Sequence, residues 1–334
     1  MKKWLLLLLI VLILPILNAC DRKENKIVIS EVAHSVFYAP QYVALSQGFF
    51  EEEGLEVSII NSNGADKVMA ALLSRDVQIG LAGTEASIYV YAEGQDNYAI
   101  NFAQLTQKDG SFLVGREPIE NFEFSMLSGA EILGGRRGGM PEMVLEYALK
   151  LNGLEVGRDD PTKEVNVRTD VQFGMLAGAF TSGEGDYVSL FEPTGTMLEK
   201  NGEGYVIASL GTETGVIPYT VYFTTKKYLE ENEEIIQKFT NAIYKGAKWV
   251  HSHSAREIAE ACLPYFPDIS LNDLTVVMQR YVDIDAWAHT PVMQKDTYER
   301  FLDIMEEAGE LPERVPYNKI VTTKFAEEAV KNLG

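Results

Sequence analysis

Short apolar runs alternate with longer amphipathic segments along the chain after position 26. Proline near the start and glycine at the end bound the first amphipathic segment, a pattern typical of a helix. Strands that alternate with helices of about ten residues predict a parallel sheet covered on both faces. The predicted strands are residues 27–29, 55–60, 77–82 and 99–105, and the predicted helices are residues 40–48, 66–74 and 85–93.

The same alternation begins again after residue 111. Its predicted strands are residues 130–133, 165–167, 186–191 and 205–210, and its predicted helices are residues 141–152 and 172–180. Residues 218–224, with alternating Tyr219, Val221 and Phe223, are expected to return to the first unit. Residues 226–309 have a helical pattern almost throughout.

This order predicts a two-lobed α/β protein in which the second unit is inserted into the first. Lobe 1 is expected to comprise residues 27–114 and 219–334, and lobe 2 residues 115–218, with chain crossings near residues 114–116 and 215–219. Ligands of open parallel sheets bind beyond the carboxyl ends of the strands. Domain interfaces are also preferred sites for small molecules. We therefore expect a ligand cleft between the lobes.

The N-terminus has the pattern of a secretory signal. Lys2 and Lys3 precede an apolar run over residues 4–17, and Leu17-Asn18-Ala19-Cys20 follows it. The run of about 14 residues is shorter than the ~20 that span a bilayer as a helix. We expect a signal peptide over residues 1–19, lipidation of Cys20, and a lipid-anchored tether over residues 20–26 outside the cytoplasmic membrane. The alternative is an ordinary signal peptide with a chance cysteine.

Composition narrows the function further. The formal net charge of −20 argues against nucleic acid as a partner, because its phosphates would be repelled. Cys262 is the only cysteine besides Cys20, so no disulfide is expected, and its helical apolar surroundings predict a packing role. Two cysteines and four histidines argue against a structural zinc site. We expect a monomer without cofactor or metal.

Several segments, in this order, resemble the ABC-transporter solute-binding proteins that capture thiamine pyrimidine precursors, sulfonates, taurine and nitrate. They are residues 35–55, 64–72, 77–80, 138–142 and 185–193. The resemblance implies the type II periplasmic-binding-protein fold, two parallel-rich sheets flanked by helices. It also implies that the lobes close on one small molecule, which a permease and ATPase complex then imports.

Candidate ligand residues of the first lobe lie at turns from strand to helix. Aromatic rings there could stack on a flat ligand, helix N–H groups suit an anion or a carbonyl, and glycines allow close backbone approach. Thr84 could equally cap a helix. The candidates are Phe37, Tyr38, Gln41, Asn63, Gly64, Gly83 and Thr84.

In the second lobe the candidates are Gly138, Gly139 and Met140 before one helix, Gln172 at the start of the next, and Glu192. Asp109 and Tyr219 adjoin the two crossings. A carboxylate at Glu192 could accept hydrogen bonds from an amino-substituted heterocycle, although it could equally be an acid at a helix N-terminus. Facing the cleft, it would repel sulfonate or nitrate. An amino-substituted heterocycle, such as a thiamine pyrimidine precursor, is therefore the favoured ligand.

Three alternatives stay open. One is an anion-binding protein of the same fold, for sulfonate, taurine or nitrate. Another is a module that presents its ligand to a membrane sensor. The third is a pyrimidine-metabolising enzyme, but the cysteine-rich motif of the related synthase and a Gly-x-Ser-x-Gly nucleophile elbow are both missing from the sequence.

Overall fold

The computed structural model describes residues 25–334. The predicted signal peptide and Cys20 lie outside the described residues. Within the described range, no helix is both long and apolar enough to cross a membrane.

The first sheet has five strands in the order β2-β1-β3-β11-β4. β1 is parallel to β2 and β3, whereas β11 is antiparallel to β3 and β4. The strands are β1 (Lys26–Glu31), β2 (Glu56–Asn61), β3 (Ile79–Gly83), β4 (Ala99–Thr106) and β11 (Thr220–Thr225).

The second sheet has six strands in the order β10-β5-β9-β6-β8-β7. β6, β7, β8 and β9 pair in parallel, and β5 is antiparallel to both β9 and β10. The strands are β5 (Ser111–Gly115), β6 (Glu131–Leu133), β7 (Val156–Arg158), β8 (Val165–Arg168), β9 (Tyr187–Phe191) and β10 (Tyr205–Ser209).

Both sheets are thus mixed. In each sheet, one strand is antiparallel to its neighbours, and the chain enters that strand directly from the other lobe. β5 follows the first crossing and β11 follows the second, without the crossover helix that a parallel strand requires. Because β5 pairs only within the second sheet, the first crossing lies at residues 107–110. The predicted boundary after Val114 is therefore too late and would cut this strand.

Helices cover both lobes and form most of the chain after β11. The first lobe contains α2 (Ala39–Ser46), α3 (Phe49–Glu52), α4 (Ala65–Leu73), α5 (Glu85–Ala92), α10 (Lys226–Glu231), α11 (Glu233–Ser252), α12 (Ala255–Cys262), α13 (Leu271–Asp283), α14 (Lys295–Glu307), α15 (Tyr317–Ile320) and α16 (Lys324–Leu333). The second contains α6 (Met140–Leu151), α7 (Leu176–Thr181), α8 (Thr194–Asn201) and α9 (Leu210–Thr214).

The long helix α11 packs closely on α2. A Cβ atom at Gly246 would lie 2.3 Å from the carbonyl oxygen of Pro40, so only glycine allows this approach. Cys262 is fully buried near α2, with its Sγ 3.9 Å from the carbonyl oxygen of Ala39. Burial raises the pKa of its thiol, which suits a packing role rather than a nucleophilic one.

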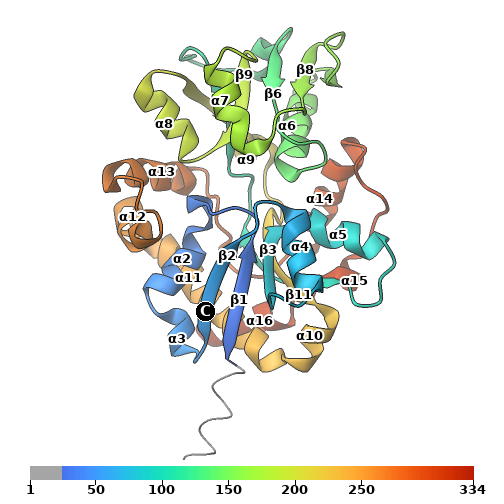
Figure 1. The fold of residues 1–334 in the computed structure, drawn as a ribbon, viewed down its shortest axis with the longest axis vertical. Helices are drawn as coiled ribbons and strands as arrows, with labels where there is room; N and C mark the ends of the chain where they lie inside the picture. Colours follow the sequence, from blue (N-terminus) through green and yellow to red (C-terminus); the bar gives the residue numbers. More distant parts are fainter. Residues whose placement is uncertain (1–24) are drawn as a thin grey trace, which may run out of the picture.

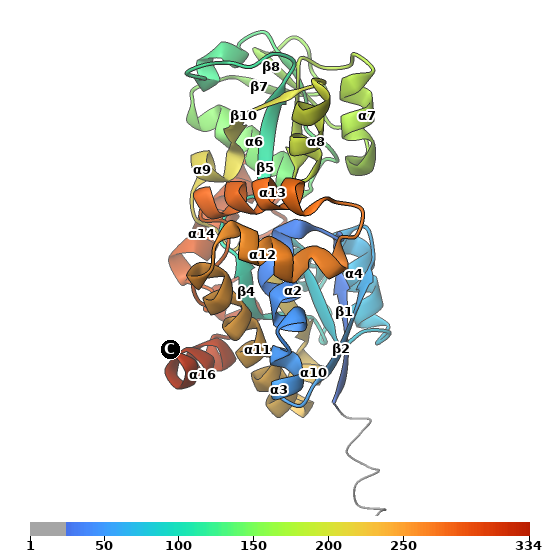
Figure 2. The ribbon, with the colours of Figure 1, turned by 90° about the vertical axis from the view of Figure 1, so that its left-hand side faces the viewer.

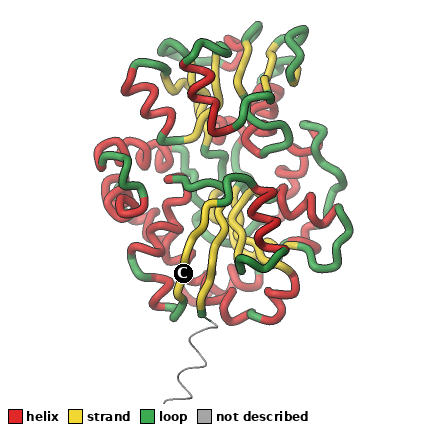
Figure 3. Tube along the Cα trace, viewed as in Figure 1, coloured by secondary structure: helices red, strands yellow, loops and turns green. Residues whose placement is uncertain are grey.

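The two sheets lie one above the other along the long axis (Figure 1). Figure 2 shows α13 at the level where the two lobes meet, above α12. The segments between the two sets of strands are largely loops (Figure 3). This is the arrangement in which residues at strand ends from both lobes come together.

Candidate functional site

Five aromatic rings gather where the two lobes meet. The ring centroid of Phe37 lies 5.1 Å from that of Tyr281, 5.7 Å from those of Tyr38 and Phe191, and 5.9 Å from that of Tyr219. Phe191 ends strand β9 of the second lobe, whereas Phe37 and Tyr38 come from the first. The rings thus form an apolar contact between the lobes, with spacings typical of interacting aromatic pairs.

The backbone holds Phe37 in place. Phe37 lies in the short 3-10 helix η1 (Val36–Tyr38), whose first turn is capped by the Ser35 hydroxyl, 3.2 Å from the Phe37 nitrogen. Trp287 Nε1 donates to the Phe37 carbonyl at 2.8 Å. A Cβ at Gly110 would lie 2.6 Å from the Phe37 ring. The first crossing therefore passes directly against this ring.

Asp109, at this crossing, is a fully buried carboxylate. Its Oδ1 accepts from the Ser111 nitrogen at 2.6 Å and from the Ser111 hydroxyl. Its Oδ2 accepts no hydrogen bond of good geometry within residues 25–334, but the Tyr219 hydroxyl lies beside the carboxylate and partly offsets the rise in its pKa. Burial raises the pKa of Asp109 to about 6, because water no longer stabilises the charged form.

Glu85 is the second buried carboxylate. It is the first residue of α5, directly after strand β3, and its Oε2 has no partner among the described residues. A Cβ at Gly83 would lie only 2.0 Å from that oxygen, so the side chain folds back over the turn. Burial raises the pKa of Glu85 to about 7.

These two carboxylates share one environment with two phenols. Burial and then the nearby Asp109 raise the pKa of Tyr219, and Glu85 adds to the rise. Burial, Glu31 and Glu85 likewise raise the pKa of Tyr38. We call Tyr38, Glu85, Asp109 and Tyr219 the acidic–aromatic cluster. It places two buried rings beside two buried carboxylates, of which Glu85 Oε2 has no hydrogen-bond partner and Asp109 has the Tyr219 hydroxyl beside it. Such carboxylates suit an additional N–H donor or a cation.

Gln41, a predicted ligand residue, is used inside the protein instead. Its Nε2 donates to Glu31 Oε2 at 3.1 Å, and its Oε1 accepts from the Tyr222 hydroxyl at 2.9 Å. Glu31 also accepts from the Tyr42 hydroxyl at 2.7 Å and lies 2.9 Å from His34 Nδ1. Because both ends of its amide have protein partners, Gln41 supports the end of β1 and is not available to a ligand.

The other turn residues of the first lobe separate into buried and exposed positions. Gly83 and Thr84 are buried, and the Thr84 hydroxyl donates to the Pro218 carbonyl at 2.7 Å. Thr84 thereby ties α5 to the second crossing and caps no helix N–H. Asn63 is exposed and Gly64 is half-buried, with a φ of 144° that favours glycine.

The glycine turn of the second lobe contacts the first lobe. The Tyr89 hydroxyl donates to the Gly138 carbonyl at 3.3 Å. Gly139 is half-buried and Met140 is buried at the start of α6. Gln172 is exposed, next to Phe173, whose ring lies 5.7 Å from that of Phe191. The predicted second-lobe residues therefore surround the contact between lobes rather than converge on one point.

Glu192 lies at the N-terminus of helix α8. This is the second of the two roles that the sequence leaves open for it. Its carboxylate accepts from the Thr196 nitrogen at 2.8 Å and pairs with Arg280 of α13. Arg280 also donates to the Thr196 hydroxyl at 2.8 Å and pairs with Glu199. Because these protein donors occupy the carboxylate, its predicted pairing with a ligand amine is not supported. Instead Glu192 joins α8 to α13 across the lobes.

A second ionic network joins the lobes on the side of α6. Arg158 lies 2.9 Å from Glu142, 2.8 Å from Glu146 and 2.8 Å from Glu310, measured from guanidinium nitrogen to carboxylate oxygen. Glu142 and Glu146 belong to the second lobe, whereas Glu310 follows α14 of the first. Arg158 also donates to the Ala308 carbonyl at 3.0 Å. In this structure, ion pairs thus connect the two lobes.

Glu85 and Arg280 are residues of this region that the sequence does not single out. Glu85 has a local signal, since it follows Gly83 and Thr84 at a strand-to-helix turn. Arg280 has none, because its partner Glu192 lies 88 positions away. The pairing depends on the packing of α13, a helix of the first lobe, against α8 of the second lobe.

Comparisons with known proteins agree with this architecture. The family model described as "NMT1/THI5 like" matches residues 36–256. YtlA of Bacillus subtilis (strain 168), named as a candidate binding protein, is 44% identical over 93% of this chain and 92% of its own. The formylaminopyrimidine-binding protein of Halalkalibacterium halodurans is 22% identical over 78% of this chain and 86% of its own.

A fungal relative carries an enzyme's name. The 4-amino-5-hydroxymethyl-2-methylpyrimidine phosphate synthase of Aspergillus parasiticus is 24% identical over 67% of this chain and 66% of its own. Among solved structures, the alkanesulfonate-binding protein SsuA of Xanthomonas axonopodis, bound to MOPS, superposes with a TM-score of 0.70. That likeness covers 90% of this chain and 98% of SsuA at 12% identity, and it shows the fold alone.

The family match spans well over half of the chain, and the Bacillus relative covers nearly all of it. The lobes, the reversed crossing strands and the superposition all agree with the resemblance read from the sequence. The chain belongs to the NMT1/THI5-like family and has the fold of ABC-importer solute-binding proteins.

Proposed function

We propose that this chain is the extracytoplasmic solute-binding component of an ABC importer, held at the membrane by lipid on Cys20. Its cleft takes a small amino-substituted heterocycle, such as a thiamine-type pyrimidine precursor. The lobes close on this ligand and present it to the permease and ATPase complex. The ligand favours the closed state through contacts that exist only there.

The observation that carries the ligand class is the pair of buried carboxylates. Glu85 Oε2 has no partner among the described residues, and Asp109 Oδ2 has only the Tyr219 hydroxyl beside it. An unpaired buried carboxylate costs several kcal/mol, so such groups are normally paired or protonated. Exocyclic amino groups and a protonated ring nitrogen would supply the missing donors, and Phe37, Tyr38 and Tyr219 would stack on the ring.

The names of relatives give independent support. One relative is named as a formylaminopyrimidine-binding protein and another as an aminopyrimidine phosphate synthase. Both names contain an amino-substituted pyrimidine, the chemistry that the acidic–aromatic cluster would recognise.

An anion is the second candidate ligand, because SsuA of the same fold is named for alkanesulfonate. The cluster argues against it. Two desolvated carboxylates would repel a sulfonate or a nitrate, and the nearby Arg136 makes an ion pair with Asp66 at 3.6 Å.

An enzyme and a sensor module are the remaining alternatives. Among the described residues, the one cysteine is buried, and burial raises the pKa of its thiol, which disfavours nucleophilic attack. A sensor module would bind the same ligand, and only its membrane partner would differ.

Isothermal titration of the full chain, purified in detergent, tests the ligand class. We expect 4-amino-5-hydroxymethyl-2-methylpyrimidine to bind one molecule per chain and taurine to bind at least about a hundredfold more weakly, a difference of ~2.7 kcal/mol. The reverse preference would replace the proposal by the anion-binding alternative. Conversion of the pyrimidine to a product during the titration would support the alternative that the protein is an enzyme.

A further inference from the structure

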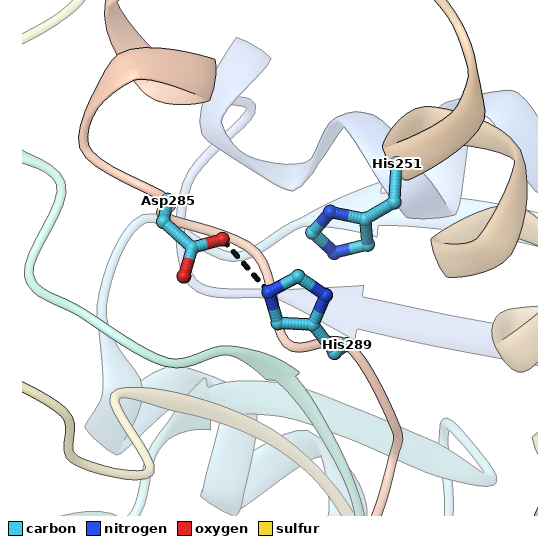
Figure 4. Close-up of side chains that lie close together, drawn as sticks. All are labelled: His251, Asp285 and His289. Carbon is cyan, nitrogen blue, oxygen red and sulfur yellow. Dashed lines mark ion pairs between the residues drawn. The ribbon is translucent and has the colours of Figure 1, made fainter.

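Two imidazoles and a carboxylate lie close together in the first lobe, and none of them belongs to the acidic–aromatic cluster (Figure 4). His251 lies in the last turn of α11, and Asp285 and His289 lie in the segment that follows α13. One ligand atom from each residue lies within 4.8 Å of the other two. Residues far apart in sequence thus place three metal-binding groups together.

The spacing fits a shared tetrahedral ion after small side-chain rotations. His289 Nε2 lies 3.0 Å from Asp285 Oδ1, and the rings of His251 and His289 are stacked with centroids 4.0 Å apart. Two ligands of a tetrahedral zinc ion, each ~2.0–2.1 Å from it, lie about 3.3 Å apart. Rotation of the imidazoles out of their stack would bring both nitrogens to such distances.

The carboxylate is oriented from behind by a partner at the first crossing. Gln107 Nε2 donates to Asp285 Oδ2 at 2.9 Å and to the Asp285 carbonyl at 3.1 Å. The Gln107 nitrogen in turn donates to the Ala286 carbonyl at 2.9 Å. Outer contacts of this kind hold metal ligands in place. Asp285 Oδ1 is left for His289 and an ion.

The segment that carries two of the ligands is anchored on the first sheet. The Ala288 nitrogen donates to the Leu105 carbonyl at 3.0 Å, and Trp287 forms an antiparallel bridge with Thr106. An ion bound here would therefore join the end of α11 to the edge strand β4. It would reinforce the first lobe beside the crossing.

We propose that His251, Asp285 and His289 form a binding site for one zinc-class divalent cation. Imidazole nitrogens suit zinc, copper and nickel rather than magnesium or calcium, and one carboxylate completes a three-ligand set. Both histidines are exposed and Asp285 is half-buried, so a fourth position is open to water. The acidic net charge of −20 favours cations near the surface. This site shares no residue with the proposed ligand cleft, although Gln107, which holds Asp285, lies two positions before Asp109.

Isothermal titration of the full chain in detergent with zinc chloride tests the site. We expect one zinc ion per chain, with His251→Ala and His289→Ala each weakening binding by at least about tenfold. The matched control is His253→Ala, two positions from His251, whose Nδ1 lies 2.8 Å from the Trp249 carbonyl and which is not part of the cluster. It is expected to leave zinc binding unchanged.

Zinc X-ray absorption of the loaded protein gives a second readout. We expect two imidazole ligands in the wild-type spectrum and one in His289→Ala. The proposal is overturned if the wild type binds no zinc, if both variants bind it as the wild type does, or if the spectrum contains no imidazole. Because His251 and His289 are exposed, both variants are expected to fold.

Discussion

Asp109→Asn and Glu85→Gln are each expected to weaken binding of 4-amino-5-hydroxymethyl-2-methylpyrimidine by about ten- to a hundredfold. A hydrogen bond to a charged group contributes ~1.5–3 kcal/mol, and the amide leaves a donor where the ligand also has a donor. Calorimetric titration measures the loss. Glu93→Gln is the matched control, because Glu93 is exposed at the other end of α5 and should bind as the wild type does.

The same two variants should make the ligand-free protein more stable. Burial raises the pKa of Glu85 from 4.5 to about 7 and that of Asp109 from 3.8 to about 6, so ionisation opposes folding. For each group this cost is absent below the unfolded pKa, grows as the pH rises, and is complete above the folded pKa. Near pH 8 it amounts to at most about 3 kcal/mol per group.

Thermal unfolding at pH 5 and pH 8 measures that cost. We expect both variants to raise the melting temperature at pH 8, and the gain to shrink at pH 5, where the wild-type carboxyls bind protons. A variant that loses both stability and binding would show that the carboxylate supports the fold and that it is not reserved for a ligand.

Arg158→Met is expected to destabilise the folded protein by about 3–5 kcal/mol. It removes the cation that lies within 2.9 Å of both Glu142 and Glu146, whose side chains are almost fully buried, and it leaves Glu142 without a cation while Glu146 keeps Lys150 at 3.3 Å. Breaking a buried ion pair by removing one partner leaves an uncompensated charge. Urea unfolding followed by circular dichroism measures the change.

Arg314→Met provides the comparison for that experiment. Arg314 also has three acidic partners, Glu299, Asp303 and Glu306, but all four side chains are at least 40% exposed. Exposed ion pairs contribute ~0–1 kcal/mol, so this variant should unfold close to the wild type. If the two variants lost the same free energy of unfolding, burial would not explain the contribution of Arg158.

The two ionic networks connect the two lobes. Arg280 links α13 to α8, and Arg158 links the second lobe to the residues that follow α14. Each network combines first-lobe and second-lobe side chains, so the opening that the proposed function requires would break or rearrange it. The acidic–aromatic cluster adjoins the crossings through Asp109 and Tyr219. Ligand contacts there and ionic contacts at the sides would together favour closure.

The pattern of apolar and polar residues predicts most strands and helices to within a few residues of their ends. The strand predicted at residues 99–105 is Ala99–Thr106, and the helix predicted at residues 141–152 is Met140–Leu151. Apolar runs and helix boundaries depend on neighbouring residues, which the sequence displays directly. The short helix α8 was missed, because Thr194–Asn201 has few apolar positions and follows a proline.

Side-chain partners were harder to predict, because they depend on contacts between distant segments. Asp109 and Tyr219 adjoin the crossings, and their place in the chain marked them as candidates. The sequence leaves two roles open for Glu192, and its pairing with Arg280 depends on α13, which is distant in the chain. The free oxygen of Glu85 is likewise a property of the packed structure, and no spacing in the sequence reveals which carboxylates lack donors.

Native mass spectrometry of the full chain, isolated gently from its host and then denatured to release bound molecules, tests the central claim most directly. We predict one small molecule per chain with the mass of an amino-substituted heterocycle, and its loss from protein carrying Asp109→Asn. A stoichiometric sulfonate or nitrate in the wild type would contradict the role proposed for the two buried carboxylates.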